Sequence, residues 1–232
     1  MIQFFKFPSA FDMRDVSPFV LKLETYMRLA GVTYNTNEMA DPRKAPKGKL
    51  PFIKDGVDAI ADSEFCIKYL KDKYGDPLGK DLSAEQHAFG HAMCVMFENR
   101  TILVLVYSRW VMPEHFPHIV DAFFGAIPKF IRGFVTKKIR KTQIDFLDAQ
   151  GIGRHTQDEI FALGVSDVKA FEGALGDKDY LFGDNPSEYD ATAYGFLANL
   201  ITKPFITPVS DYIENSKPLM AYLERIEMKA FG

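Results

Sequence analysis

Three short segments of the chain combine residue types that can bind or activate a small ligand. Ser17-Pro18 opens a run with helical spacing of apolar residues, and a hydroxyl at a helix start can donate to an anionic sulfur that the helix dipole also favours. Asp62-Ser63 opens a second such run, where free backbone amides can hold a carboxylate. Leu50-Pro51 precedes a short apolar run, and a cis X-Pro peptide there would turn a strand edge outward, toward an extended ligand.

Each segment also has a purely structural alternative. Ser17 can be a helix N-cap and nothing more, and so can the Asp62-Ser63 pair, because a side-chain oxygen at that position satisfies an otherwise unpaired amide. Pro51 can be an ordinary trans proline at the start of a strand. The local sequence leaves both interpretations open at all three places.

The connection over residues 8–16 adds a further alternative for the first helix start. It is long for this position, so the Ser17 hydroxyl could lie away from a bound ligand. In that case Met13, Arg14 and Asp15 would occupy the neighbourhood of the ligand instead.

The elements that must position these segments form a compact unit in the first third of the chain. Short apolar runs bounded by turn residues predict strands, and apolar residues at helical spacing predict helices. The predicted strands cover residues 2–7, 32–34, 50–53 and 59–61, and the predicted helices cover 17–30 and 63–74. The stretch 40–48 contains Pro42 and Pro46, which predicts irregular structure or barely one helical turn.

Beyond a linker at residues 75–82, the sequence predicts helices only. Ser83 and Thr156 each begin a capping box, in which the cap hydroxyl and the side chain three residues later satisfy each other's amides, and Ser187 begins a variant of it. The predicted helices cover about residues 84–110, 117–147, 157–175, 187–202 and 216–228. The expected fold class is therefore α/β followed by all-α.

The composition sets the broad class of protein. The chain has 232 residues, 47% hydrophobic and 25% charged, and a net charge of −3, which argues against disorder and gives no general attraction to nucleic acid. Its two cysteines, Cys66 and Cys94, exclude a disulfide framework and indicate a reducing compartment. We see neither a signal peptide nor the ~18 uncharged apolar residues of a membrane helix, so we expect a cytoplasmic protein without a membrane span.

A basic stretch stands out at residues 129–141. It carries six lysines and arginines and no acid, interleaved with the apolar residues Phe130, Ile131, Phe134, Val135 and Ile139. This pattern predicts a basic amphipathic helix. Such a helix could contact anionic lipid or an acidic partner, or simply be a solvated face.

Taken together, these segments resemble the glutathione transferase superfamily. The likeness extends over nearly the whole chain and is strongest to the branch of failed-axon-connections and metaxin-like proteins. The strings that carry it are SPFVLKLET at 17–25, KGKLPFI at 47–53, GIGRH at 151–155 and GDNPS at 183–187. The resemblance implies a thioredoxin-like glutathione-binding domain at 1–76 and an all-helical domain of the glutathione transferase type at 84–232.

The resemblance also implies roles for the three segments. In the superfamily a Leu-Pro or Val-Pro peptide is cis and the residue before it pairs with the cysteine of glutathione, which gives these roles to Pro51 and Leu50. A Glu or Gln followed by Ser grips the γ-glutamyl end, and Asp62-Ser63 holds these places with a side chain one methylene shorter. Ser17 is the candidate catalytic residue, whose hydroxyl would donate to the glutathione thiolate.

The implied function is a glutathione transferase-like detoxification enzyme with glutathione as co-substrate, whose thiolate attacks a small electrophile or reduces a peroxide. The alternative is a non-catalytic adaptor or ligand-binding protein of the metaxin-like type. A homodimer is expected, since it is common among relatives, and no metal is expected. Tyr107 and Trp110 could line a pocket for an apolar co-substrate, with core packing as the alternative.

Overall fold

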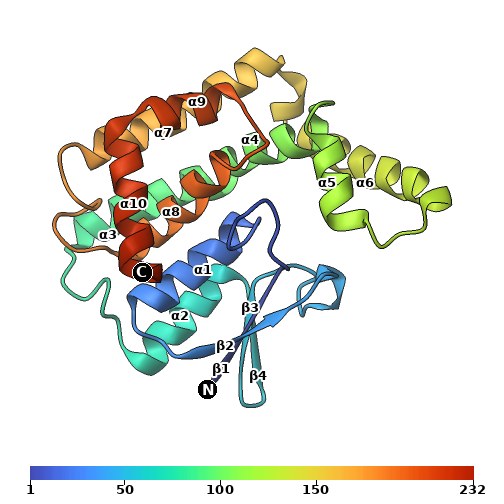
Figure 1. Ribbon diagram of the computed structural model, residues 1–232. Coiled ribbons are helices and arrows are strands. Elements are labelled where there is room, and N and C mark those ends of the chain that lie inside the picture. Colours follow the sequence, from blue (N-terminus) through green and yellow to red (C-terminus); the bar gives the residue numbers. More distant parts are fainter.

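The computed structural model describes all residues 1–232 and begins with a four-stranded mixed sheet (Figure 1). The strand order is β2-β1-β3-β4, with β1 parallel to β2 and antiparallel to β3, and β4 antiparallel to β3. The strands are β1 (Ile2–Lys6), β2 (Tyr34–Glu38), β3 (Phe52–Asp55) and β4 (Asp58–Ala61). Two helices, α1 (Pro18–Leu29) and α2 (Ser63–Tyr74), pack on this sheet and share one apolar cluster with it.

Two of the predicted strands are displaced along the chain. β2 begins at Tyr34, because Gly31 makes a left-handed turn and the strand that follows, YNTNE, is a polar edge strand without an apolar signal. β3 begins at Phe52, two residues after the predicted start. The stretch 40–48 forms only the 3₁₀ turn η1 (Pro42–Lys44), as its prolines predict.

No strand follows β4, so the prediction of a helical remainder is confirmed. A continuous helical run is built of α3 (Ala84–Met96), the π-helical η2 (Phe97–Thr101), α4 (Ile102–Val106) and the π-helical η3 (Tyr107–Val111). The other helices are α5 (Phe116–Phe124), α6 (Lys129–Ala149), η4 (Ile152–Arg154), α7 (Gln157–Leu175), α8 (Glu188–Leu200), α9 (Pro208–Asn215) and α10 (Lys217–Phe231).

Two details of the helical part differ from the prediction. The helix expected at 117–147 is interrupted between α5 and α6, where Gly125 and Pro128 lie. α9 was not predicted: the predicted helices leave residues 203–215 without an element. Pro208 occupies the first helical position, where its missing amide costs nothing, and Thr207 caps the helix.

The run from Ala84 to Val111 meets the length and composition of a membrane-spanning helix, which the sequence was not expected to contain. Its most apolar window has a mean hydropathy of 1.3, and 28% of that window is buried inside the protein. Phe97, Val104 and Leu105 of this run belong to the apolar cluster of the helical part. Core helices of other proteins meet the same criterion, and part of this run contributes to the core here.

The sheet part and the helical part meet where α1 packs against α8. Leu21 of α1 belongs to the apolar cluster of the helical part, and Ala191 of α8 belongs to that of the sheet part. Gly195 permits this approach, because a Cβ atom there would lie 2.7 Å from the Pro18 carbonyl oxygen and 2.9 Å from the Lys22 amide. α1 is therefore covered on both sides.

Candidate functional site

The topology brings the three predicted segments to one edge of the sheet. β1 and β4 run in the same direction, because each is antiparallel to β3. α1 follows β1 and α2 follows β4, so both helices begin at the edge where those strands end, and β3 starts at that edge. Ser17, Leu50-Pro51 and Asp62-Ser63 therefore share one sheet edge, at which two helix N-termini are directed.

The Leu50-Pro51 peptide bond is cis, as predicted. Leu50 is buried, and neither its amide nor its carbonyl is hydrogen-bonded within the chain, because the ladder between β1 and β3 begins only at Phe52. The Pro51 carbonyl accepts a 3.3 Å hydrogen bond from the Asp62 amide, which fixes the start of α2 beside this segment. Leu50 thus carries a free pair of backbone groups next to that helix start.

Asp62 and Ser63 have different roles at the start of α2: the first caps the helix and the second offers a free hydroxyl. The Asp62 carboxylate caps the helix by accepting from the Glu64 amide at 3.1 Å, and its φ of 87° is a left-handed value that few non-glycine residues adopt. Ser63 is 4% exposed, and its hydroxyl has no hydrogen-bond partner within the chain. The Ser63 hydroxyl and the free amides of the first turn are left for a ligand.

Ser17 is the N-cap of α1, with extended backbone and Pro18 at the first helical position. Its hydroxyl oxygen accepts from the Val20 amide at 3.5 Å, the outer limit of a hydrogen bond. The cap interaction uses the oxygen as an acceptor and leaves the hydroxyl hydrogen free to donate. The predicted cap is present, and a catalytic role for Ser17 stays a prediction.

Asp15 organises the connection that leads to Ser17. Its side chain is fully buried and accepts from two backbone amides, that of Ser17 at 2.8 Å and that of Phe7 at 3.0 Å. Burial raises the pKa of this carboxyl to about 7, against the lowering influence of these amides and of Lys6. Asp15 therefore fixes the helix start from inside the protein and does not project to a ligand.

The two residues that precede Asp15 also make contacts away from the candidate site. The Arg14 guanidinium donates to the Glu227 carboxylate of α10 at 2.6 Å, and the Met13 sulfur accepts from the Thr202 hydroxyl. Both side chains thus contact the helical part of the protein.

A buried arginine of one helix connects the same segment to a second helix through hydrogen bonds. Arg109 of η3 donates to the Val16 carbonyl at 2.6 Å and to the backbone and side-chain oxygens of Asn199 on α8 at 2.9 and 3.0 Å. Arg109 is buried, and burial lowers the pKa of its guanidinium to about 10. The residues just before Ser17 are therefore held by side chains from both sides of the junction.

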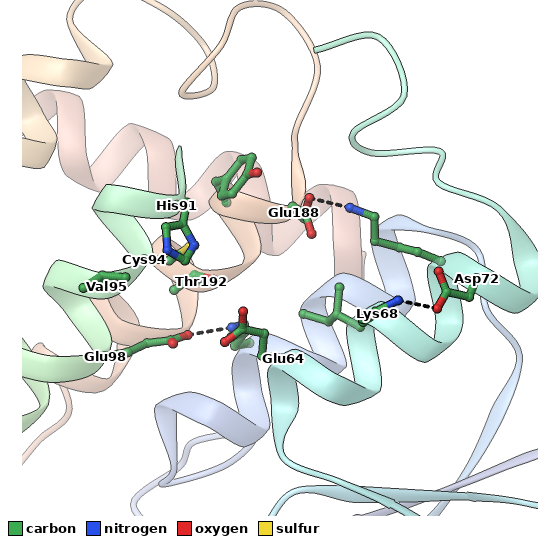
Figure 2. Close-up of a pocket in the computed structure, with 13 residues that line it drawn as sticks. Glu64, Lys68, Asp72, His91, Cys94, Val95, Glu98, Glu188 and Thr192 are labelled. Carbon is green, nitrogen blue, oxygen red and sulfur yellow. Dashed lines mark hydrogen bonds and ion pairs between the residues drawn. The ribbon is translucent and has the colours of Figure 1, made fainter. Parts of the chain in front are cut away.

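A cleft of about 390 Å³ opens between α2, α3 and α8 and begins at Glu64, next to Ser63 (Figure 2). Both Lys22 of α1 and Glu98 line it, and the Lys22 ammonium pairs with the Glu98 carboxylate at 2.6 Å. Burial opposes the charge of Lys22, but the attraction of Glu98 and other groups around it together raises the pKa of the ammonium. The cleft thus adds an ion pair between a buried lysine and a half-buried glutamate beside the start of α2.

The remaining candidate residues make ordinary packing contacts. The Tyr107 ring packs edge-on against Phe161, and the Trp110 ring lies 6.4 Å from those of Phe116 and Phe124. Neither residue lines the cleft. Their assignment to a co-substrate pocket stays a prediction.

Neither cysteine has the character of a nucleophile. The Cys66 thiol donates to the Ile60 carbonyl at 3.2 Å. Burial raises the pKa of both Cys66 and Cys94 to about 12. Reactive cysteines need the opposite shift.

Comparison with known proteins decides the family. Residues 18–115 match the family model "Glutathione S-transferase N-terminal domain", and residues 164–226 match "Glutathione S-transferase, C-terminal domain". The isoprene-epoxide glutathione S-transferase of a Rhodococcus species is 30% identical, with 97% of this chain and 98% of that protein covered. The chain belongs to the glutathione S-transferase family.

Other relatives of this glutathione S-transferase family member belong to the predicted branch. Failed axon connections of Drosophila melanogaster is 31% identical, and the match covers all of this chain and 58% of that protein. Human metaxin-2 is 24% identical over 81% of this chain and 72% of its own length. The chain therefore spans little more than half of Failed axon connections and nearly all of the Rhodococcus enzyme.

Solved structures show the same fold. A glutathione transferase from Phanerochaete chrysosporium has a TM-score of 0.69 at 17% identity, covering 100% of this chain and 98% of that one. A glutathione S-transferase of Ceriporiopsis subvermispora, solved in complex with glutathione, has a TM-score of 0.65 at 17% identity with the same coverage. These comparisons confirm the fold class, a thioredoxin-like sheet part followed by a helical part.

Lys22, Glu98 and Arg109 are the residues of this site that sequence reasoning missed. Lys22 lies at the flank of the predicted apolar face of α1, one helical turn before Tyr26, and a lysine at such a position is usually exposed. A small residue on another helix, Gly195, is what lets α8 cover that side. No local pattern in α1 signals this burial.

Proposed function

We propose that this protein is a glutathione transferase that binds glutathione at the shared sheet edge and promotes attack of its thiolate on a small electrophile or peroxide. The observation that carries the proposal is the free amide and carbonyl of Leu50, placed beside the unpartnered Ser63 hydroxyl at the same edge as Ser17. Family membership and the Rhodococcus relative support it.

In this proposal each segment contacts a different part of the tripeptide. The extended backbone at the cysteine of glutathione pairs with the amide and carbonyl of Leu50, as one strand pairs with another. The γ-glutamyl carboxylate accepts from the Ser63 hydroxyl and the first amides of α2. The γ-glutamyl ammonium lies toward the acidic side of the cleft, where Glu64 and Glu98 lie.

Ser17 would then act on the thiol. Its free hydroxyl hydrogen donates to the sulfur, and the N-terminus of α1 stabilises the negative charge that develops there. Ser17 is not itself a nucleophile in this scheme. The buried contacts of Asp15 and Arg109 hold Ser17 in place without touching the ligand.

Calorimetric titration with glutathione, followed by a conjugation assay with an activated aryl halide, tests the proposal. Binding at millimolar or lower concentration together with conjugation supports the transferase. Binding without conjugation supports the ligand-binding alternative, and no binding at high glutathione concentration supports the metaxin-like adaptor. The homodimer and the cytoplasmic location stay predictions.

A further inference from the structure

The arm formed by α5, α6 and the four residues between them projects from the helical part, away from α10 (Figure 1). Near the start of α6, Phe130 is 88% exposed, Phe134 is 77% exposed and Ile131 is 41% exposed. The two phenylalanines are among the most exposed large apolar side chains of the protein. Two adjacent exposed phenylalanines, one helical turn apart, form an apolar patch that a purely solvent-facing helix surface does not need.

A row of lysines continues the same face of α6. Phe130, Phe134, Lys137 and Lys141 are spaced at i, i+4, i+7 and i+11, so they lie along one side of the helix. Lys138 lies beside this row. Phe130 and Lys137 are seven residues apart, or roughly 10 Å along the axis. The arm thus carries an apolar end followed by a basic band.

Most of these lysines are free to meet a partner. Lys129, Lys137 and Lys138 are exposed and have no ion pair within the chain, and Lys141 pairs only with Asp145 on its own helix. From Phe116 to Ile144 the only acidic residue is Asp121. The arm is therefore strongly basic in a chain whose net charge is −3, and the rest of the molecule is correspondingly acidic.

The two arginines of α6 have a different task, which is to hold the arm in shape. Arg132 donates to the carbonyls of Gly125 and Ile127 in the connection between the helices, at 2.6 and 2.9 Å. Arg140 donates to the carbonyls of Trp110 and Val111 at 3.0 and 2.6 Å. These bonds fix both the tip and the base, so the exposed face is presented by a braced helix.

We infer that the arm docks this protein on the surface of an anionic lipid bilayer. Phe130 and Phe134 enter the boundary between headgroups and acyl chains, and the lysine band contacts headgroup phosphates. Because these residues lie along one side of α6, the phenylalanines and the lysines can meet the same lipid surface together. The acidic remainder of the chain is repelled by the same surface, so the arm alone faces the membrane.

Sedimentation with lipid vesicles tests this inference. We expect the protein to bind phosphatidylcholine vesicles that contain about one third phosphatidylserine, to ignore pure phosphatidylcholine, and to dissociate as salt is raised. Replacing Lys137 and Lys138 by Gln should weaken binding by about fivefold for each cation. Phe130→Ser with Phe134→Ser should reduce binding at least as much.

Matched controls separate the arm from general effects of charge and apolar surface. Lys80→Gln with Lys217→Gln removes two other exposed lysines, and Val57→Ser removes a fully exposed apolar side chain elsewhere. Both control proteins should bind like the wild type. Equal losses in controls and arm variants, or no binding of wild type to anionic vesicles, would overturn the inference, and the latter would favour an acidic protein partner or a second copy.

A fluorescence measurement reports where the tip lies. Trp110 is the only tryptophan, so Phe130→Trp in a Trp110→Phe background places one probe at the tip. Its emission should shift to the blue and be quenched by brominated acyl chains on anionic vesicles. Unchanged emission upon binding would show that lysines alone adsorb and would contradict insertion. None of these readouts depends on glutathione, so their failure leaves the proposed transferase untouched.

Discussion

The Ser17 amide donates a 2.8 Å hydrogen bond to the buried carboxylate of Asp15, so the residue that starts α1 is anchored by an acid two positions before it. The same carboxylate accepts from the Phe7 amide at the end of β1. A connection that is long in sequence is thereby drawn back to the sheet edge. This anchoring explains how a helix start at the end of a long connection can still face a ligand held at Leu50 and Ser63.

Asp15 makes the free energy of unfolding depend on pH in an unusual direction. The folded protein keeps the Asp15 proton up to about pH 7, whereas the unfolded chain releases it near the ordinary value of 3.8. As pH rises between these values the unfolded chain binds fewer protons than the folded one, so stability falls. Relative to Asp15→Asn, the wild type should lose on the order of 4 kcal/mol between about pH 4 and pH 8.

Chemical denaturation of both proteins across this pH range measures the difference. The Asp15→Asn variant is the right control because it keeps the size of the side chain and removes its titration. A difference that stays flat, or that grows with pH, would show that Asp15 is ionised in the folded protein at every pH tested.

Gly195 controls the contact between α1 and α8. In Gly195→Ala the new Cβ meets the backbone of Pro18 and Lys22 at 2.7 and 2.9 Å, and backbone cannot rotate away. We expect a loss of about 1–3 kcal/mol or more in the free energy of unfolding. Gly133→Ala on α6 is the matched control, since nothing lies within 4 Å of its Cβ. That change should be neutral or stabilise by about 0.5–1 kcal/mol, because alanine favours helix.

Ser63 should contribute to affinity for glutathione and little to folding. Ser63→Ala removes one hydroxyl donor to a charged group, so binding measured by calorimetry should weaken by about 1–2 kcal/mol. Ser166→Ala, at an exposed serine of α7, is the comparison and should bind like the wild type. Equal affinity in wild type and Ser63→Ala would mean that the γ-glutamyl end is held elsewhere.

Much of the fold follows from local signals in the sequence. Ser17-Pro18, Leu50-Pro51 and Asp62-Ser63 were recognised because caps and prolines restrict the backbone at the residue itself, and all three lie where these rules put them. Thr207-Pro208 carries the same kind of signal at the start of α9, a helix that was not predicted.

The burial of the charged residues of the site could not be predicted from such local signals. Lys22 and Arg109 are buried because segments distant in sequence cover them, α8 in one case and the connection before Ser17 in the other. A charged side chain is buried only where partner groups replace its lost hydration. Glu98 is that partner for Lys22, and the oxygens of Asn199 serve Arg109. A single sequence does not pair residues that lie 76 or 90 positions apart.

The state of the bound thiol tests the central claim most directly. The ultraviolet absorbance of glutathione thiolate should appear at neutral pH when glutathione is added to the wild type, since Ser17 and the α1 N-terminus lower the pKa of the bound thiol. In Ser17→Ala, compared on folded protein because loss of the cap costs about 1 kcal/mol, affinity should be nearly unchanged while thiolate and conjugation are lost together. Thiolate absorbance of equal size in Ser17→Ala, or none in a wild type that binds glutathione, would contradict the account.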